Sequence, residues 1–272
     1  MPHVLAVSNQ KGGVGKTTTA INLSVALTLS LQKVLLIDLD PQGNTSSGLG
    51  FPKSKNALGI SDVLLGHQDL NNIIKKVELA SQSPLHVAPV SSFLMDHLSE
   101  IDRLSNKEHL LRHAISELLS RESFDYIIID CPPALNLLTT NAFCAASELL
   151  LPIQAEYYAL EGINDLLMYL QKMKRSFNAP IKLGNVLLTM VTPSTLSQEV
   201  VEQVSIFFGT DYGFSQVIPR DSSLAEAPSH GRSIFQYKPY SNGAYAYTEI
   251  ALELQQRHGT LKEDLPSYIR AQ

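Results

Sequence analysis

The sequence has few of the features that mark secreted or membrane proteins. It holds two cysteines, Cys131 and Cys144, among 272 residues, too few for a disulfide framework. No apolar run is long enough to span a bilayer. The N-terminus enters an apolar strand pattern at once and carries no signal peptide. We therefore expect a cytoplasmic protein in a reducing environment, with no stable membrane insertion.

The sequence also lacks an excess of basic residues. Lys and Arg number 21 against 26 Asp and Glu, which gives a formal net charge of −5 and a pI of about 5.9. This balance excludes a surface that attracts nucleic acid everywhere, so a DNA-binding patch would have to be local. Apolar material is ample, since 44% of the residues are hydrophobic. The length fits one large α/β domain over residues 1–272.

A glycine-rich stretch, S-N-Q-K-G-G-V-G-K-T-T-T at residues 8–19, is the most informative part of the chain. It lies between an apolar run at 3–7 and a helical pattern that begins near Lys16. Strand, glycine loop and helix is the order in which a phosphate-binding loop occurs. The glycines have no side chains, so backbone N–H groups can close on an anion. The helix N-terminus adds unpaired N–H groups and a positive dipole end.

Two side chains of this loop indicate a nucleoside triphosphate bound with Mg²⁺. Lys16 supplies a mobile positive charge for the outer phosphates, and the Thr17 hydroxyl is placed to ligate the metal ion. The alternative, a plain strand–helix turn, does not explain why glycines, lysine and threonine all fall at the required spacing. The predicted nucleotide-binding residues of the loop are Lys11, Gly12, Gly13, Val14, Gly15, Lys16, Thr17 and Thr18.

A second lysine distinguishes this loop from the usual pattern G-x-x-x-x-G-K-[ST]. Position 10 is Gln where that pattern has Gly, and Lys11 stands five residues before Lys16. Within one subunit Lys11 would crowd the phosphates that Lys16 already holds. Across a dimer interface it would neutralise charge on the partner's nucleotide, as an arginine finger does. The loop thus predicts a homodimer formed with ATP.

Asp40 is the candidate for positioning the water that attacks the γ-phosphate. The run Q-K-V-L-L-I-D-L at 32–39 predicts a strand parallel to the first, and it ends in D-P-Q-G-N. Ligands bind at the carboxyl edge of such sheets. We choose Asp40 over Asp38 because only Asp40 lies at the loop edge. The alternative is that Asp40 caps the following helix.

Asp130 ends a second apolar strand pattern, F-D-Y-I-I-I-D at 124–130. This is a Walker B pattern, in which the carboxylate holds Mg²⁺ through a water. Pro132 and Pro133 stiffen the loop that follows. The predicted metal ligands are Thr17, Asp40 and Asp130.

The rest of the chain alternates between strand and helix patterns, which predicts a single doubly wound, mostly parallel sheet flanked by helices. We assign no chemistry to residues 51–84, apart from a short helical piece at 60–65. The further predicted helices are 94–104, 110–119, 136–146, 162–177, 196–208 and 241–256. The further predicted strands are 85–90, 147–153, 185–190 and 214–218.

The stretch K-G-G-V-G-K-T-T at 11–18 resembles the deviant Walker A loop of the ParA/MinD/nitrogenase-iron-protein class of dimeric ATPases. Three further stretches resemble ParA in particular: D-L-D-P-Q-G-N at 38–44, Q-A-E-Y-Y-A-L-E-G at 154–162, and I-P-R-D-S-S-L-A-E-A-P-S-H-G at 218–231. The resemblance covers nearly the whole chain and is weakest at 51–120. It implies a P-loop NTPase fold with ATP and Mg²⁺ as ligands.

The resemblance also assigns roles to single residues. Lys11 would act in trans, Asp40 matches the catalytic Asp of switch I, and Asp130 matches the Walker B Asp of switch II. With Lys16, these are the predicted catalytic residues. Pro219 and Asp221 would border the adenine base, although many relatives have Asn where Asp221 stands.

The predicted DNA contacts come from two places. Arg220 matches a DNA-contacting arginine of the family, although on physical grounds alone it is a plain loop charge. Lys172, Lys174 and Arg175 end a predicted helix, where they either compensate the helix dipole or contact DNA phosphates. One departure counts against DNA: residues 191–196 read V-T-P-S-T-L, without the arginine that ParA proteins usually carry there.

The resemblance implies a ParA/Soj-type ATPase for chromosome or plasmid partitioning. Its ATP dimer would bind double-stranded DNA without sequence preference and so associate with the nucleoid. Its slow hydrolysis would be stimulated by a ParB-like protein.

The alternative is a MinD-like or other positioning ATPase whose cargo is a protein or membrane assembly. The mixed charge of residues 261–272 and Pro266 argue against membrane docking. A scaffold that scarcely hydrolyses ATP and a small-molecule ligase are the remaining alternatives.

Overall fold

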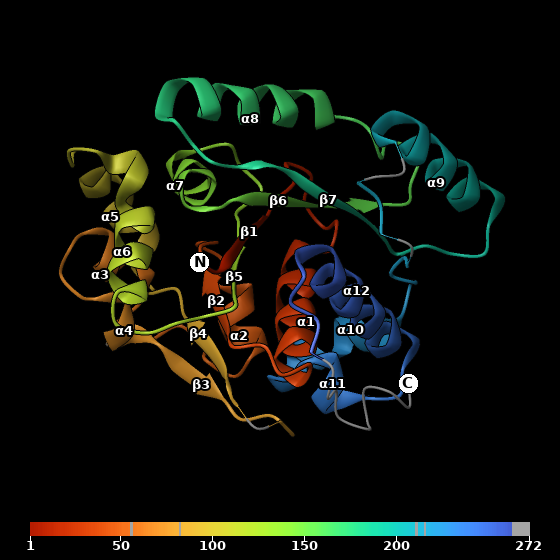
Figure 1. Ribbon diagram of the computed structural model, residues 1–272, viewed down its shortest axis with the longest axis horizontal. Helices are drawn as coiled ribbons and strands as arrows, with labels where there is room; N and C mark the ends of the chain where they lie inside the picture. The colour runs from red at the N-terminus through yellow and green to blue at the C-terminus, as the bar shows by residue number, and fades with distance from the viewer. Residues whose placement is uncertain (55–56, 82, 210–211, 215, 263–272) are drawn as a thin grey trace.

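A computed structural model describes residues 1–54, 57–81, 83–209, 212–214 and 216–262 of the chain (Figure 1). Within these residues the strands form one sheet in the order β3-β4-β2-β5-β1-β6-β7. All neighbouring strands are parallel except β3 and β4, which are antiparallel. This confirms the predicted fold class. The strands are β1 His3–Val7, β2 Val34–Asp38, β3 Lys75–Val77, β4 Leu85–Ala88, β5 Tyr126–Asp130, β6 Glu148–Gln154 and β7 Lys182–Thr189.

The central strands are apolar at almost every position because helices cover both faces of the sheet. The side chains of V-L-L-I-D in β2 and Y-I-I-I-D in β5 are all buried. Parallel strands covered on both sides show such continuous hydrophobic runs in place of alternation. This is why the sequence predicted these strands correctly.

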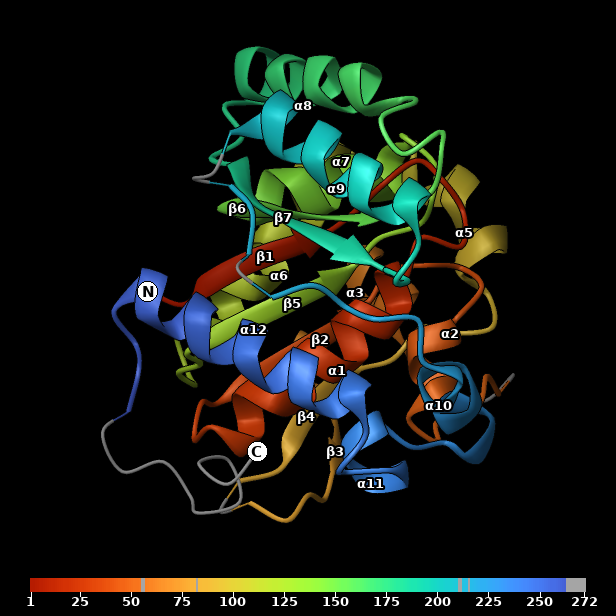
Figure 2. The same ribbon diagram turned by 90° about the vertical axis from the view of Figure 1, so that its right-hand side faces the viewer.

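The helices form two layers with separate hydrophobic cores. The core on one face joins the sheet to α1, α10, α11 and α12, and the core on the other face joins it to α3 through α9. Figure 2 shows α1 and α12 side by side on one face, with α7 and α8 beyond the sheet. The helices are α1 Lys16–Leu29, α2 Asn44–Gly48, α3 Ile60–Leu64, α4 Leu70–Ile73, α5 Leu94–Ile101, α6 Leu110–Leu119, α7 Leu137–Ala145, α8 Ile163–Phe177, α9 Thr195–Phe208, α10 Ser222–Glu226, α11 Ile234–Tyr237 and α12 Asn242–His258. Short 3₁₀ turns cover Lys107–His109 and Ala227–His230.

The register of the central strands brings the predicted site residues to one edge of the sheet. Val7 at the end of β1 and Asp38 at the end of β2 both pair with Asp130 at the end of β5. The glycine loop follows β1 directly. The loop and both acidic strand ends therefore meet at the carboxyl edge, where ligands bind in α/β sheets.

The predicted strand at 214–218 is wrong for the part that the structure describes, and residue 215 lies outside that part. Two isolated parallel bridges join this region to β7 and its extension, Val186 to Gly213 and Val191 to Pro219. Ile218 still bonds to this extension, since its N–H donates to the Leu188 carbonyl oxygen at 2.9 Å and its carbonyl oxygen accepts from the Val191 N–H at 3.0 Å. The sequence also did not predict β3, whose exposed Lys75 and Lys76 give it no apolar run.

The structure tests one of the two expectations about membranes and does not describe the residues on which the other depends. None of the helices in the described residues has the length and apolar content that crossing a bilayer requires. The argument from the C-terminal stretch rested largely on residues 263–272, including Pro266, and these lie outside the described residues.

Candidate active site

The glycine loop is anchored at its entry and needs glycine within it. The Lys11 N–H donates to Asn9 Oδ1 at 3.0 Å, and Asn9 Nδ2 donates to the Pro152 carbonyl oxygen at 2.8 Å. Gly13 and Gly15 have φ angles of 77° and 88°, in the left-handed region that residues with a Cβ adopt only with strain. Gly15 is the N-cap of α1. The loop therefore turns its backbone N–H groups and the start of α1 toward one point.

Lys16 is buried against its own loop. The residue is only 7% exposed, and its Nζ donates to the Lys11 carbonyl oxygen at 2.9 Å. Burial lowers the pKa of Lys16, while the negative charges of Asp130 and Asp40 oppose that shift. A phosphate group would offer this ammonium a stronger partner than a carbonyl does.

The side chain of Lys11 is placed differently from that of Lys16. Lys11 is half-buried, and its Nζ has no hydrogen bond or ion pair with the described residues. The part of the chain that the structure describes therefore does not hold this ammonium, which agrees with the expected action in trans.

Asp130 lies at the centre of a hydroxyl cluster. Its Oδ2 accepts hydrogen bonds from Thr17 Oγ1 at 2.8 Å and Thr45 Oγ1 at 2.7 Å. Its Oδ1 is buried and has no hydrogen-bond partner among the described residues. Burial, and then the nearby charge of Asp38, raise the pKa of Asp130. A cation beside Oδ1 would satisfy this oxygen and offset both effects, so Asp130 and Thr17 fit the predicted Mg²⁺.

The two acidic residues of β2 and its following loop differ in their surroundings. Asp38 is fully buried, and its Oδ2 accepts from the Ser46 N–H at 2.8 Å and the Ser46 hydroxyl at 2.6 Å. Burial raises the pKa of Asp38. Asp40 lies at the loop edge, where its Oδ1 accepts from the Gln42 N–H at 2.9 Å. Asp40 does not cap α2, because the N-cap residue is Gly43.

A cavity of about 390 Å³ opens beside the glycine loop, between the end of β7, α10 and α12. Pro219 and Asp221, the residues predicted to border the adenine base, line it. However, both oxygens of Asp221 accept backbone N–H groups, from Ser223 at 2.9 Å and from Gly243 at 3.1 Å. The carboxylate thus ties α10 to α12. The cavity is lined by Gly15, Thr18, Thr189, Met190, Ile218, Pro219, Arg220, Asp221, Ser222, Leu224, Ala225 and Tyr247.

Sequence comparisons place this site in a known family. The profile of a family described as an AAA domain matches residues 2–183. The sporulation initiation inhibitor protein Soj of Bacillus subtilis is 41% identical over 255 residues, which cover 93% of this chain and 98% of that protein. The chromosome-partitioning ATPase Soj of Treponema pallidum is 40% identical over 260 residues, or 95% of this chain and 99% of that protein. The chain belongs to the ParA/Soj family of chromosome-partitioning ATPases.

Solved structures agree with a ParA/Soj assignment at the level of the fold. A structure of cobyrinic acid a,c-diamide synthase from Mycobacterium smegmatis, with a bound ATP analogue and magnesium, has a TM-score of 0.79 at 30% identity. It covers 95% of this chain and 96% of its own. The cell division ATPase MinD of Pyrococcus furiosus has a TM-score of 0.75 at 28% identity, covering 94% and 100%. The predicted P-loop NTPase fold is confirmed, and the ligands of the synthase agree with the predicted ATP and Mg²⁺.

The structure separates the two predicted DNA contacts of this ParA/Soj protein. Arg220 is exposed beyond the end of β7, where its N–H donates to the Val191 carbonyl oxygen at 3.0 Å. The α8 basic cluster, defined as Lys172, Lys174 and Arg175, is also exposed. It lies at the end of α8 that leads into the start of β7 (Figure 1). Since β7 has eight residues and rises about 3.3 Å per residue, its two ends lie roughly 23 Å apart.

Sequence reasoning missed several residues of the site. Thr45 was not singled out, although its hydroxyl shares Asp130 with Thr17. Its place in T-S-S, directly after the Asp40 loop, was the available signal. Tyr247 also was not assigned, yet it lines the cavity and its hydroxyl lies 3.1 Å from Thr19 Oγ1.

Proposed function

We propose that this chain is an ATP-driven switch that partitions DNA. It binds Mg·ATP and forms a homodimer with the nucleotide between the subunits. The ATP dimer binds double-stranded DNA through its phosphates without sequence preference. Hydrolysis is slow until a ParB-like protein stimulates it, and hydrolysis then releases the DNA. Family membership supports this function, and the observation that carries it is the second loop lysine, Lys11, whose Nζ has no hydrogen-bond or ion-pair partner among the described residues.

In this proposal each site residue has a separate role in nucleotide binding or hydrolysis. Backbone N–H groups of the glycine loop bind the phosphates, and Lys16 exchanges the Lys11 carbonyl oxygen for a phosphate oxygen. Thr17 and Asp130 would hold Mg²⁺, which when bound neutralises charge on the phosphate oxygens. Asp40 orients the attacking water from the loop edge. Lys11 of each subunit reaches the nucleotide of the other and stabilises the charge that develops there.

The γ-phosphate acts in this scheme as the ligand that shifts a monomer–dimer equilibrium. Only the triphosphate carries the charge that Lys11 neutralises across the interface. Loss of that phosphate removes the differential interaction and lets the dimer separate. Nucleotide state and DNA binding are coupled in this way without a rearrangement of the sheet.

The proposal is tested by DNA binding in two nucleotide states. Wild-type protein and Asp40→Ala are titrated with non-specific duplex DNA in ATP and in ADP, over a salt series. We expect binding in ATP only, weakening as salt rises, and a longer-lived complex for Asp40→Ala because its ATP is not cleaved. Absence of DNA binding in both nucleotides, with an intact ATP dimer, would refute the DNA part of the proposal.

One observation favours a second candidate, a positioning ATPase whose cargo is a protein assembly. Residues 191–196 contain no basic side chain, so part of the family's DNA surface is missing. A dimer that forms with ATP and ignores DNA at low salt would establish this candidate. A ligase function, suggested by the name of the synthase, would require turnover that depends on a small acceptor molecule, and the higher identity to the Soj proteins weighs against it.

A further inference from the structure

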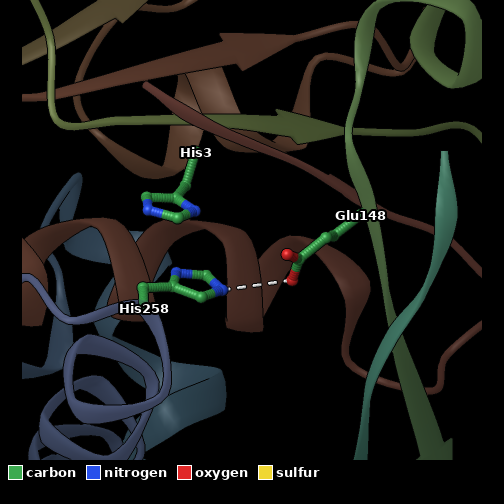
Figure 3. Close-up of side chains that lie close together, drawn as sticks. All are labelled: His3, Glu148 and His258. Carbon is green, nitrogen blue, oxygen red and sulfur yellow. Dashed lines mark hydrogen bonds and ion pairs between the residues drawn. The ribbon is translucent and has the colours of Figure 1, made fainter. Parts of the chain in front are cut away.

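Two histidines and a glutamate meet at the edge of the sheet opposite the glycine loop. His3 begins β1, Glu148 begins β6 and His258 ends α12 (Figure 3). One possible ligand atom from each residue lies within 4.8 Å of the other two. Among the described residues this is the group whose spacing suits a metal ion. The three positions are distant in sequence, so no local sequence motif predicts the cluster.

The donor atoms of the cluster face a common region. The rings of His3 and His258 are stacked, with centroids 3.8 Å apart and planes 4° from parallel. One nitrogen of each ring lies on the side of Glu148 (Figure 3). His258 Nε2 is 3.1 Å from Glu148 Oε2. Both members of that pair are largely shielded from water, with side chains 7% and 11% exposed.

We propose that His3, Glu148 and His258 form a binding site for a zinc-like divalent transition-metal ion, which joins the C-terminal end of α12 to β1 and β6. Two imidazole nitrogens and one carboxylate oxygen are a ligand set of Zn²⁺, with water in the fourth position. The same set suits Mg²⁺ poorly, because that ion prefers oxygen ligands and keeps its waters. The site is therefore distinct in chemistry from the Mg²⁺ position at Asp130.

The surroundings of His258 support its role as a ligand. Its Nδ1 lies 3.2 Å from the Tyr126 hydroxyl, which in turn is 2.6 Å from Thr260 Oγ1. Burial raises the pKa of Tyr126 to about 12, so this hydroxyl remains a neutral hydrogen-bond partner. With the proton on Nδ1, Nε2 presents its lone pair to the metal, and such a second hydrogen bond is typical of histidine ligands.

The surroundings of Glu148 leave space for its carboxylate and favour its ionised form. A Cβ on Gly184 would lie 2.7 Å from Glu148 Oε2, so only glycine leaves room for the carboxylate there. Lys182 Nζ lies 3.6 Å from Glu148 Oε1 and helps to keep the group ionised. An ion between Glu148 and His258 would replace their direct hydrogen bond by two metal–ligand bonds.

One movement is required for the metal to bind. The nitrogen lone pairs of His3 and His258 lie in two nearly parallel planes that do not meet at a single ion, so one ring must tilt before both can point at it. His3 is the ring that can tilt, since it is only half-buried and lies at the start of β1. The ion would then hold α12 against the sheet behind α1, with which α12 packs.

Calorimetric titration with Zn²⁺ tests the proposal. Tag-free protein is stripped with EDTA and saturated with Mg·ADP, so that the nucleotide site is occupied. We expect one Zn²⁺ per chain, and an unfolding midpoint that rises by roughly 5 °C when free Zn²⁺ is about 100 times its dissociation constant. Co²⁺ in place of Zn²⁺ should give the intense visible absorption of a tetrahedral site.

The variants His3→Gln and His258→Gln should each weaken Zn²⁺ binding at least about tenfold. His113→Gln is the matched control, because His113 stands near another histidine, His109, with ring centroids 6.4 Å apart, and its loss should change nothing. His3→Gln decides the matter if His258→Gln fails to fold. No Zn²⁺ binding by the wild type, or binding that survives His3→Gln, would overturn the proposal.

Discussion

Thr45 shows how a single hydroxyl affects the buried carboxylate of Asp130. It donates to the same oxygen of Asp130 as Thr17 does, and it comes from α2, 85 residues away. Hydrogen bonds to an ionised carboxylate favour its charged form, whereas burial raises the pKa of Asp130. Thr45 thus helps to keep Asp130 ready for a cation.

We expect Thr45→Val to destabilise the nucleotide-free protein by about 1.5–3 kcal/mol, the usual loss for a hydrogen bond to a charged group. Affinity for Mg·ATP should fall as well, because Asp130 then binds a proton more readily. Urea unfolding and nucleotide titration measure the two effects. The control is Thr28→Val, which loses only a hydrogen bond to the Ser24 carbonyl oxygen. Equal losses in both variants would show that Thr45 does not support Asp130.

Glu148 gives the fold a dependence on pH that can be separated from metal binding. The hydrogen bond from His258 lowers the pKa of Glu148 below the usual range of a glutamate, although burial opposes the shift. A carboxyl group whose folded pKa is depressed stabilises the protein above its unfolded pKa. That contribution is lost as the pH falls through the folded pKa.

In EDTA at pH 7 we expect Glu148→Gln to lower the free energy of unfolding by about 1–2 kcal/mol. The difference from wild type should shrink as the pH falls below the unfolded pKa of about 4.3, and it should vanish once Glu148 is protonated in both states. Denaturant unfolding across this range measures it. Glu199→Gln, at an exposed position of α9, should stay within about 0.5 kcal/mol of wild type. A difference that does not change with pH would contradict this account.

Residues of the site were predictable from sequence where their neighbours along the chain define them. The local sequence pattern identifies both the glycine loop and Asp130 at the end of its strand. Asp40 was preferred to Asp38 from its place at the loop edge, and its catalytic role stays a prediction. Glu148 and His258 were not predictable, because 110 residues separate them and only the fold brings them together.

At the scale of elements, buried strands were predicted best. The sequence of β5 reads as a strand because it is apolar at nearly every position and ends in a charged residue. The failure at 214–218 has the opposite cause. Those residues match a strand in composition, but the described ones belong to no regular strand, and only their neighbours Gly213 and Pro219 form isolated bridges beside β7. Composition describes what a segment can form, whereas the partner's backbone decides whether pairing is regular.

The length of β7 allows the two predicted DNA contacts to be tested separately. On one subunit, Arg220 and the α8 basic cluster lie toward opposite ends of this strand, whose eight residues span roughly 23 Å at about 3.3 Å per residue. That length corresponds to about 7 base pairs of duplex. A short duplex bound at Arg220 does not reach the α8 basic cluster, whereas a long duplex can reach both sites.

We expect Arg220→Ala to weaken binding of the ATP dimer to duplexes of about 8 and about 24 base pairs alike. The slope of log affinity against log salt should become shallower by about 1. The triple variant Lys172→Ala, Lys174→Ala, Arg175→Ala should weaken binding to the longer duplex only. Fluorescence anisotropy measures both. An unchanged slope for the triple variant on long DNA would assign that cluster to compensation of the α8 dipole.

At the scale of the whole molecule, the sequence predicted the class of fold because alternating strands and helices admit few arrangements. The central strand order is consistent with that prediction, and the antiparallel edge strand β3 is an addition that the sequence did not indicate. The extent of the domain over residues 1–272 stays a prediction. So does the dimer, because a second subunit leaves no trace in one chain except a group that lacks a partner.

Lys11 is such a group as far as the structure describes the chain, and its substitution tests assembly directly. Within its own chain the loop already has Lys16, which is buried and bound to the Lys11 carbonyl oxygen. Removing the Lys11 side chain should therefore leave ATP binding to the monomer nearly unchanged. It should remove the charge that favours the dimer when the γ-phosphate is present.

We expect Lys11→Ala to bind a non-hydrolysable ATP analogue with an affinity within about threefold of wild type, a difference below about 1 kcal/mol. It should remain monomeric where the wild type dimerises. Sedimentation velocity with the analogue and with ADP measures the assembly. Lys76→Ala, on the exposed edge strand β3, removes the same charge far from the loop and should dimerise normally. A normal ATP dimer of Lys11→Ala would rule out the trans role, whereas loss of ATP binding would mean that Lys11 serves the nucleotide of its own chain.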